Sequence, residues 1–127
     1  MTNKLNKSKK ILLVEDEKTL SEMYKTKFER ENFQVLTADN GTPVLELAKK
    51  EKPDAILLDI ILPKMDGFTV LKQLKSDPKT KSIPVLMLTN LGQEEDIKKG
   101  KSLGAKDYIV KANFTPSQVV EKVREVV

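Results

Sequence analysis

Five short apolar segments alternate along this chain with five stretches whose apolar residues recur at helical spacing. The apolar segments are residues 10–14, 33–37, 54–58, 84–89 and 107–110. The first, third and fourth are almost continuously apolar, which is typical of parallel strands that are covered on both faces. This alternation predicts an α/β domain with a parallel sheet, helices on both faces and right-handed crossovers.

Five strands in 127 residues fit one doubly wound domain with strand order 2-1-3-4-5, the flavodoxin-like (βα)5 arrangement. Four helices are predicted from apolar stripes that would face the sheet: Leu20, Met23, Tyr24 and Phe28; Val44, Leu45 and Ala48; Phe68, Leu71 and Leu74; Val119, Val120, Val123 and Val127. The fourth of the five helices, at residues 93–103, has only Ile97 and Leu103 as large apolar anchors. Gly100 lies inside it, so we expect this helix to be weakly held and mobile.

Two threonine–proline pairs predict the starts of helices. In Thr42-Pro43 and Thr115-Pro116, the threonine would cap the helix and the proline would take its first position. Gln118 would complete a capping box in the second case.

The net charge of +4 is concentrated at the N-terminus, because residues 1–10 contain four lysines and no acid. The other 19 basic residues balance 19 acidic ones, so the folded body is neutral and we expect no direct contact with nucleic acid. We predict a flexible lysine-rich tail at residues 1–8 and one folded domain at residues 9–127. The chain has no cysteine, no apolar run that could span a bilayer and no signal-peptide pattern. We therefore expect a cytoplasmic protein without a membrane partner.

The chain contains no histidine. This excludes serine–histidine and cysteine–histidine catalysis, and it excludes histidine-bound metals. Any chemistry must rely on carboxylates, lysine, threonine or tyrosine, alone or with an oxygen-bound cation.

Polar residues stand where the predicted strands end. Glu15 and Asp16 follow the first strand, and Asp59 follows the apolar run AILL of the third. Thr89 ends the fourth strand, and Lys111 follows the fifth. Because parallel strands end at the same edge of a sheet, these residues would converge on one crevice.

Three carboxylates in one crevice repel one another unless a counter-charge is present. Mg2+ is a natural partner, because it prefers one or two carboxylates together with water and phosphate oxygens. Lys111 and Thr89 would add a positive charge and a hydroxyl donor, which together with the metal suit a phosphoryl group in transfer. Asp59, nearest the middle of the sheet, is then a candidate nucleophile that forms an aspartyl-phosphate.

In this order and spacing, the residues resemble the receiver domain of two-component response regulators, over residues 9–127. The matching pieces are Glu15-Asp16 after ILLV; Asp59 followed by Leu62-Pro63, Met65, Asp66 and Gly67; Thr89 after PVLML; Tyr108; and Lys111.

The resemblance implies a phosphorylation-switched signalling module whose only catalysis is its own phosphorylation and slow dephosphorylation. Asp59 would accept the phosphoryl group. Asp16 and Asp59 would bind Mg2+ directly, Glu15 would bind it mainly through water, and the backbone carbonyl of Ile61 would be a further ligand.

The resemblance also implies a switch. Thr89 and Lys111 would contact the phosphoryl oxygens, and the Tyr108 ring would change rotamer as Thr89 moves. The signalling surface would be the fourth helix, the fifth strand and the fifth helix.

The implied partners are proteins. Receiver domains take their phosphoryl group from a phosphohistidine, which this chain lacks, so the donor would be a sensor histidine kinase or a histidine phosphotransfer protein. A downstream target protein would read the signal, and the domain would be a monomer or a dimer that forms on phosphorylation. The chain ends just after the last predicted helix, so we expect either a single-domain regulator that resembles chemotaxis regulators or a piece cut from a longer protein.

Two positions depart from the family pattern. Ala112 follows Lys111, where the family usually has a proline joined by a cis bond; we expect a trans bond here or appreciable strain. Asn90 stands next to Thr89, where the family prefers a small residue. Its side chain would either narrow access to the phosphoryl site or hydrogen-bond within its loop.

Other functions compete with this interpretation. The alternative is a pseudo-receiver that acts as a protein-interaction module with little or no phosphorylation. A hydrolase with an aspartyl nucleophile is disfavoured, because Ile61 stands where such enzymes commonly have a second acid. A flavin site is disfavoured because residues 15–17 are all acidic and would repel a phosphate.

Each residue taken alone also has a purely structural interpretation. Asp16 would suit the positive end of the first helix, and Lys111 would be an ordinary solvated lysine. Thr89 would be a strand-end hydroxyl, and Tyr108 a half-buried sheet residue. Asp59 fits such an interpretation least, because a lone acid in an apolar run is costly unless a charge meets it.

Overall fold

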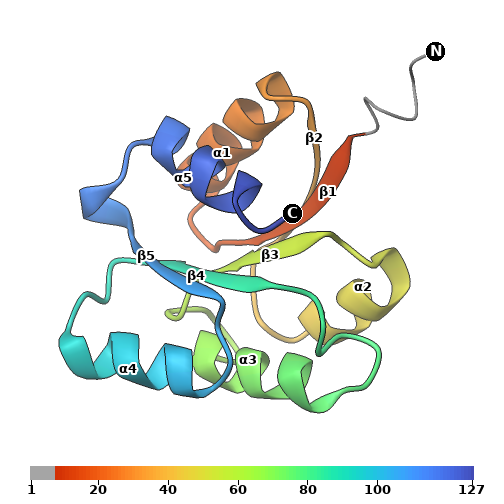
Figure 1. Cartoon of the computed structure of the whole chain (residues 1–127), viewed down its shortest axis with the longest axis vertical. Helices are drawn as coiled ribbons and strands as arrows, with labels where there is room; N and C mark the ends of the chain where they lie inside the picture. Colours follow the sequence, from red (N-terminus) through yellow and green to blue (C-terminus); the bar gives the residue numbers. More distant parts are fainter. Residues whose placement is uncertain (1–7) are drawn as a thin grey trace.

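The computed structural model describes residues 8–127, which form one parallel sheet covered by helices on both faces (Figure 1). Its strands are β1 (Lys9–Val14), β2 (Phe33–Ala38), β3 (Ala55–Leu58), β4 (Val85–Thr89) and β5 (Asp107–Val110). They lie in the order β2-β1-β3-β4-β5, and every pairing is parallel. The predicted flavodoxin-like topology is confirmed.

The helices are α1 (Lys18–Arg30), α2 (Val44–Glu51), α3 (Gly67–Ser76), α4 (Glu94–Ser102) and α5 (Pro116–Arg124), with a short 3-10 turn, η1 (Lys111–Asn113). Helices α1 and α5 cover one face of the sheet, and α2, α3 and α4 cover the other (Figure 1). Within residues 8–127, no helix is both long and apolar enough to cross a bilayer.

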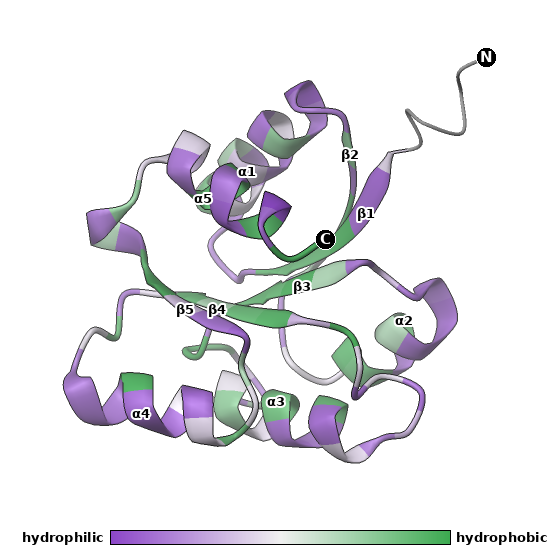
Figure 2. Cartoon of the chain, viewed as in Figure 1, coloured by the Kyte–Doolittle hydropathy of each residue, from purple (hydrophilic) through white to green (hydrophobic). Residues whose placement is uncertain are grey.

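Alternation along the strands divides the core into two layers. In β1, Ile11 and Leu13 pack with the α1 and α5 side chains, whereas Leu12 and Val14 pack with those of α2 and α3. All four side chains are at most 1% exposed. Figure 2 shows the apolar strands between helices whose outer faces are hydrophilic. The sheet is therefore anchored on both faces, and the loops at its edges are positioned by a rigid centre.

Two predictions about the helices were wrong, each for a local reason. Met23 is 38% exposed, because Tyr24 and Phe28, one turn apart, form the buried row of α1 and leave Met23 beside it. Thr42 does not cap α2: its hydroxyl contacts Asn40 Oδ1 at 2.5 Å, and the helix begins at Val44 after Pro43.

The other predicted cap is present at α5. Thr115 accepts a hydrogen bond from the Gln118 amide, and Gln118 returns one to the Thr115 amide, as in a capping box. The helix α4 fully buries only Gly100, while Ile97 and Leu103 are partly buried against the core, as expected of a weakly anchored helix. The predicted tail at residues 1–8 lies, except for Ser8, outside the described residues.

Candidate functional site

The three predicted carboxylates meet at the carboxyl edge of the sheet. Val14 and Leu58 are paired across β1 and β3, so the residues that follow them emerge side by side. One carboxylate oxygen from each of Glu15, Asp16 and Asp59 lies within 4.8 Å of the others. Glu15 and Asp59 are buried, at 3% and 6% exposure, whereas Asp16 is exposed. The cluster therefore has two acids that are shielded from solvent, and Asp16 lies on its solvent-exposed side.

Lys111 places a positive charge on the inner part of this cluster. Its ammonium lies 2.8 Å from Asp59 Oδ2 and 2.5 Å from Glu15 Oε1, and its side chain is 9% exposed. Burial alone lowers the pKa of Lys111, but hydrogen bonds to Asp59 and Glu15 outweigh burial and raise the pKa above its usual value. Lys111 is therefore a fixed cation and not the solvated lysine of the structural interpretation.

Backbone amides hold the two buried acids from the other side. Asp59 Oδ1 accepts a hydrogen bond from the Ile60 amide at 2.7 Å, so its two oxygens have different partners. Glu15 Oε2 accepts from the Glu17 amide at 3.0 Å. Both carboxylates are thus oriented before any ligand arrives, which reduces the reorganisation that binding requires.

Asp16 is free to serve as an outward-facing ligand. Within residues 8–127 it makes no side-chain hydrogen bond or ion pair. Helix α1 begins at Lys18 with Glu17 as its cap, and its first turn contains no acid. The helix-dipole interpretation of Asp16 therefore does not apply, and the oxygen set of the cluster fits a hard cation such as Mg2+.

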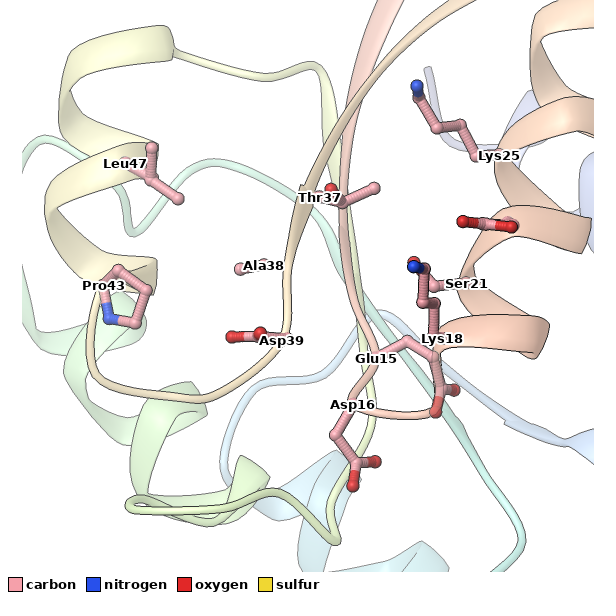
Figure 3. Close-up of a pocket in the computed structure, with 11 residues that line it drawn as sticks. Glu15, Asp16, Lys18, Ser21, Lys25, Thr37, Ala38, Asp39, Pro43 and Leu47 are labelled. Atoms are coloured by element: carbon pink, nitrogen blue, oxygen red, sulfur yellow. The ribbon is translucent and has the colours of Figure 1, made fainter.

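A surface hollow of about 590 Å³ adjoins the cluster on the side of α1, β2 and α2 (Figure 3). Glu15 and Asp16 belong to its lining, together with Lys18 and Lys25 of α1 and Asp39 after β2. Asp59 and Lys111 are outside the lining, so the buried Asp59 carboxylate lies beyond the hollow and not within it.

Thr89 and Tyr108 are linked through the loop that follows β4. Thr89 is 1% exposed, and its Oγ1 accepts a hydrogen bond from the Leu91 amide at 3.4 Å. The Tyr108 hydroxyl donates to the Leu91 carbonyl at 2.6 Å, and its ring lies against Gly100 of α4. Burial raises the pKa of Tyr108 to about 12, so this hydroxyl stays a donor at neutral pH.

The two departures from the family pattern have simple local structures. The bond between Lys111 and Ala112 is trans, since the described chain contains no cis peptide, and Lys111 still reaches both buried acids. Asn90 is exposed, and within the described residues its side chain makes no hydrogen bond. Ile61, whose carbonyl was predicted to bind the metal, is 63% exposed at the rim of the site.

Sequence reasoning missed three supporting roles. Asp66 caps α3 by accepting from the Phe68 and Thr69 amides, a role that its position before a helical stripe could have indicated. Gly67 lies so close to the Asp59 backbone that a Cβ there would be 2.1 Å from the Asp59 carbonyl oxygen. Leu91 acts through its backbone, which the side-chain pattern does not report.

Comparison with known proteins assigns this arrangement to a family. The sequence profile described as the response regulator receiver domain matches residues 11–124. The chain belongs to this family. PilH of Pseudomonas aeruginosa is 44% identical to this receiver domain over 104 residues, which are 80% of this chain and 84% of PilH.

Longer regulators and solved structures agree with this assignment. The transcriptional regulatory protein PhoP of Bacillus subtilis, named for alkaline phosphatase synthesis, is 41% identical over 94% of this chain, which spans only 48% of PhoP. A response regulator from Chloroflexus aurantiacus superposes with a TM-score of 0.88 at 34% identity, covering 94% of this chain and 98% of that one. The chemotaxis protein CheY4 of Vibrio cholerae gives 0.87 at 30% identity, covering 94% and 99%.

Proposed function

We propose that this receiver domain is a phosphorylation-activated switch in which Asp59 accepts a phosphoryl group from a phosphohistidine donor in trans. The main support is the position of Asp59, a buried carboxylate held between the Lys111 ammonium and a backbone amide. A group that is already oriented and charge-compensated can attack phosphorus with little rearrangement. The chain has no histidine, so a histidine kinase or a histidine phosphotransfer protein supplies the donor.

Transfer would break the bond between phosphorus and the donor nitrogen and form one between phosphorus and an Asp59 oxygen. Lys111 would then balance negative charge on the phosphoryl oxygens, because its ammonium already lies 2.8 Å from Asp59. Thr89 would supply a hydroxyl donor from the neighbouring strand β4. Asp16, Asp59, the Ile61 carbonyl and, through water, Glu15 would hold Mg2+. When bound, the metal would neutralise further charge on the phosphoryl oxygens.

The signal would leave through α4, β5 and α5. Movement of Thr89 toward a phosphoryl group would disturb the loop at Leu91, to which both Thr89 and Tyr108 are hydrogen-bonded. Tyr108 packs on Gly100, the one fully buried residue of α4. A change in the Tyr108 rotamer would therefore alter how α4 packs on the sheet. A downstream protein in the cytoplasm would recognise the altered face, with the receiver as a monomer or a phosphorylation-dependent dimer.

Uptake of a phosphoryl group by Asp59 is the direct test. After incubation with acetyl phosphate and Mg2+, intact-mass spectrometry should detect one phosphoryl adduct on the wild-type chain. The adduct should be absent from Asp59→Asn and present on Asp54→Asn, a control acid that precedes the same strand. An unmodified wild-type chain, or an adduct that persists in Asp59→Asn, would favour the pseudo-receiver or another acceptor.

Mg2+ should stabilise the folded domain, because the acid cluster exists only in the folded state. At about 100 times Kd the expected gain is roughly 2.7 kcal/mol. Asp16→Asn should remove most of this gain and leave the metal-free protein as stable or more stable, since Asp16 has no partner to lose among the described residues. Thermal unfolding with and without Mg2+ measures the metal-free stability and the gain from Mg2+. Asp39→Asn, an exposed acid on the nearby hollow, is the control, and equal Mg2+ gains in both variants would contradict the site.

A further inference from the structure

The edge of the sheet opposite the acid cluster bears a row of exposed lysines that the proposed switch does not use. Lys9 opens β1, Lys52 lies in the connection before β3, and Lys106 directly precedes β5. Lys79 and Lys81 lie in the connection before β4. All five are exposed, and within residues 8–127 none makes an ion pair. We call these five residues the lysine row.

The parallel sheet explains why these residues lie together. Parallel strands all begin at one edge, so the residues before β1, β3, β4 and β5 are neighbours in space. Backbone hydrogen bonds join these starts: the Lys106 amide donates to the Val85 carbonyl, and the Asp54 amide donates to the Lys10 carbonyl. With strands about 4.8 Å apart, the row extends over roughly 14 Å.

Most acids at this edge are paired with bases that do not belong to the row. Four of them form ion pairs with bases outside the row: Glu51 with Lys10, Asp77 with Lys49, Asp107 with Lys122, and Glu31 with Arg124. Asp54, beside Lys52, accepts a hydrogen bond from the Lys10 amide. Asp54 and Glu125, the C-cap of α5, make no ion pair within residues 8–127 and keep their negative charge. The five lysines of the row outnumber these two acids, so the edge keeps a positive charge.

Basic side chains in the last turns of the helices add positive charge at the same edge. Each of the five helices has a basic residue in its last turn, and these turns lie at the edge where the strands begin. Basic residues at helix ends have a structural explanation, because they favour the negative end of the helix dipole. That explanation applies to Lys52, the C-cap residue of α2, but not to Lys9, Lys79, Lys81 and Lys106, which lie outside the helices and their caps.

We propose that the lysine row is a docking surface for an acidic segment of a partner protein, separate from the α4, β5 and α5 face. A line of single charges suits an extended chain of carboxylates, since lysine pairs with them without strict geometry. The row contains neither arginine nor aromatic residues, the side chains that nucleic-acid surfaces use for bidentate contacts and stacking. The only exposed large apolar residues of the described chain, Met23 and Ile61, are not part of the row, so it lacks an anchor for a lipid surface.

This surface does not depend on the proposed phosphorylation. Asp59 lies after β3 and the lysine row lies before the strands, so one molecule can use both edges together. Binding at the row should be driven by charge and should weaken as salt increases.

The test compares two triple variants with the same change in net charge. In one, Lys52, Lys81 and Lys106 of the row become glutamine; in the control, the same change is made at Lys25, Lys72 and Lys98, which lie on helices. A fluorescein-labelled peptide of ten glutamates is the probe, and fluorescence polarisation measures its Kd at low and high salt. Circular dichroism checks that both variants are folded.

The control should bind the peptide like the wild-type chain, and the row variant should bind about tenfold more weakly. No binding by the wild-type chain, or the same loss in both variants, would overturn the proposal. Tighter binding of a labelled oligothymidylate, lost in the row variant, would assign the surface to nucleic acid instead. Concentration-dependent self-association in sedimentation velocity, lost in the row variant, would assign it to the acidic edge of a second copy.

Discussion

Replacing Lys111 with methionine is expected to lower the free energy of unfolding by about 3 kcal/mol in EDTA. The Lys111 ammonium is the cation that contacts both Glu15 and Asp59, which are 3% and 6% exposed. Without it, two buried carboxylates would face each other with no counter-charge. Methionine keeps the apolar stem of the side chain, so the loss reports charge and not packing.

Mg2+ should restore part of the stability of Lys111→Met, because a divalent cation would supply the missing positive charge to the same acids. Urea unfolding in EDTA and in excess Mg2+ measures both effects. Lys18→Met, which removes an exposed lysine near the cluster, should change stability by less than about 0.5 kcal/mol. A small loss in EDTA, or no recovery in Mg2+, would show that the acids do not depend on Lys111.

The same variant should take up phosphoryl groups from acetyl phosphate about 100-fold more slowly than the wild type. This loss should persist in saturating Mg2+, since the metal replaces the charge of Lys111 but not its position. Recovery of stability without recovery of rate would therefore separate the two roles of this lysine.

Gly67→Ala is expected to destabilise the domain by about 3 kcal/mol and to impair Asp59 at the same time. A Cβ at this position would lie 2.1 Å from the Asp59 carbonyl oxygen and 2.6 Å from the Ile60 Cα. Both atoms belong to the backbone, so no side-chain rotation can relieve the clash, and the peptide that bears Asp59 must move. Urea unfolding and the acetyl phosphate assay measure the two losses.

Gly92→Ala is the matched control for Gly67→Ala. A Cβ at Gly92 would meet only the Val110 side chain, at 3.4 Å, which is an ordinary contact. We expect a change in stability within about 0.5 kcal/mol. If the two variants behaved alike, the close approach of α3 to the Asp59 loop would not be a constraint on the fold.

The topology could be predicted from the sequence because the spacing of apolar residues and the positions of capping and turn residues agree along most of the chain. The run AILL can be buried on both faces only as an inner strand, and β3 is central in the sheet. The predictions failed where one local rule competed with another. Thr42 could have capped a helix or joined a turn, and the structure has its hydroxyl on Asn40 in the turn.

The candidate site could be predicted in its members but not in its contacts. That Glu15, Asp16 and Asp59 gather at one edge follows from strand order and strand ends alone. The burial of Glu15 and Asp59, and the contact of Lys111 with both, depend on how the loops after β1 and β3 meet η1 at the edge of the sheet. The spacing of residues along the chain does not predict which acids are buried or which of them Lys111 contacts.

The sequence by itself determined the alternation of strands and helices, and with it the edge where the acids collect, because periodicity and strand direction are local properties. The tertiary structure alone decided the pairing of Lys111 with two acids and the backbone approach that requires Gly67. These features join residues that are distant in the chain, and their energies depend on distance and burial, which exist only once the sheet has formed.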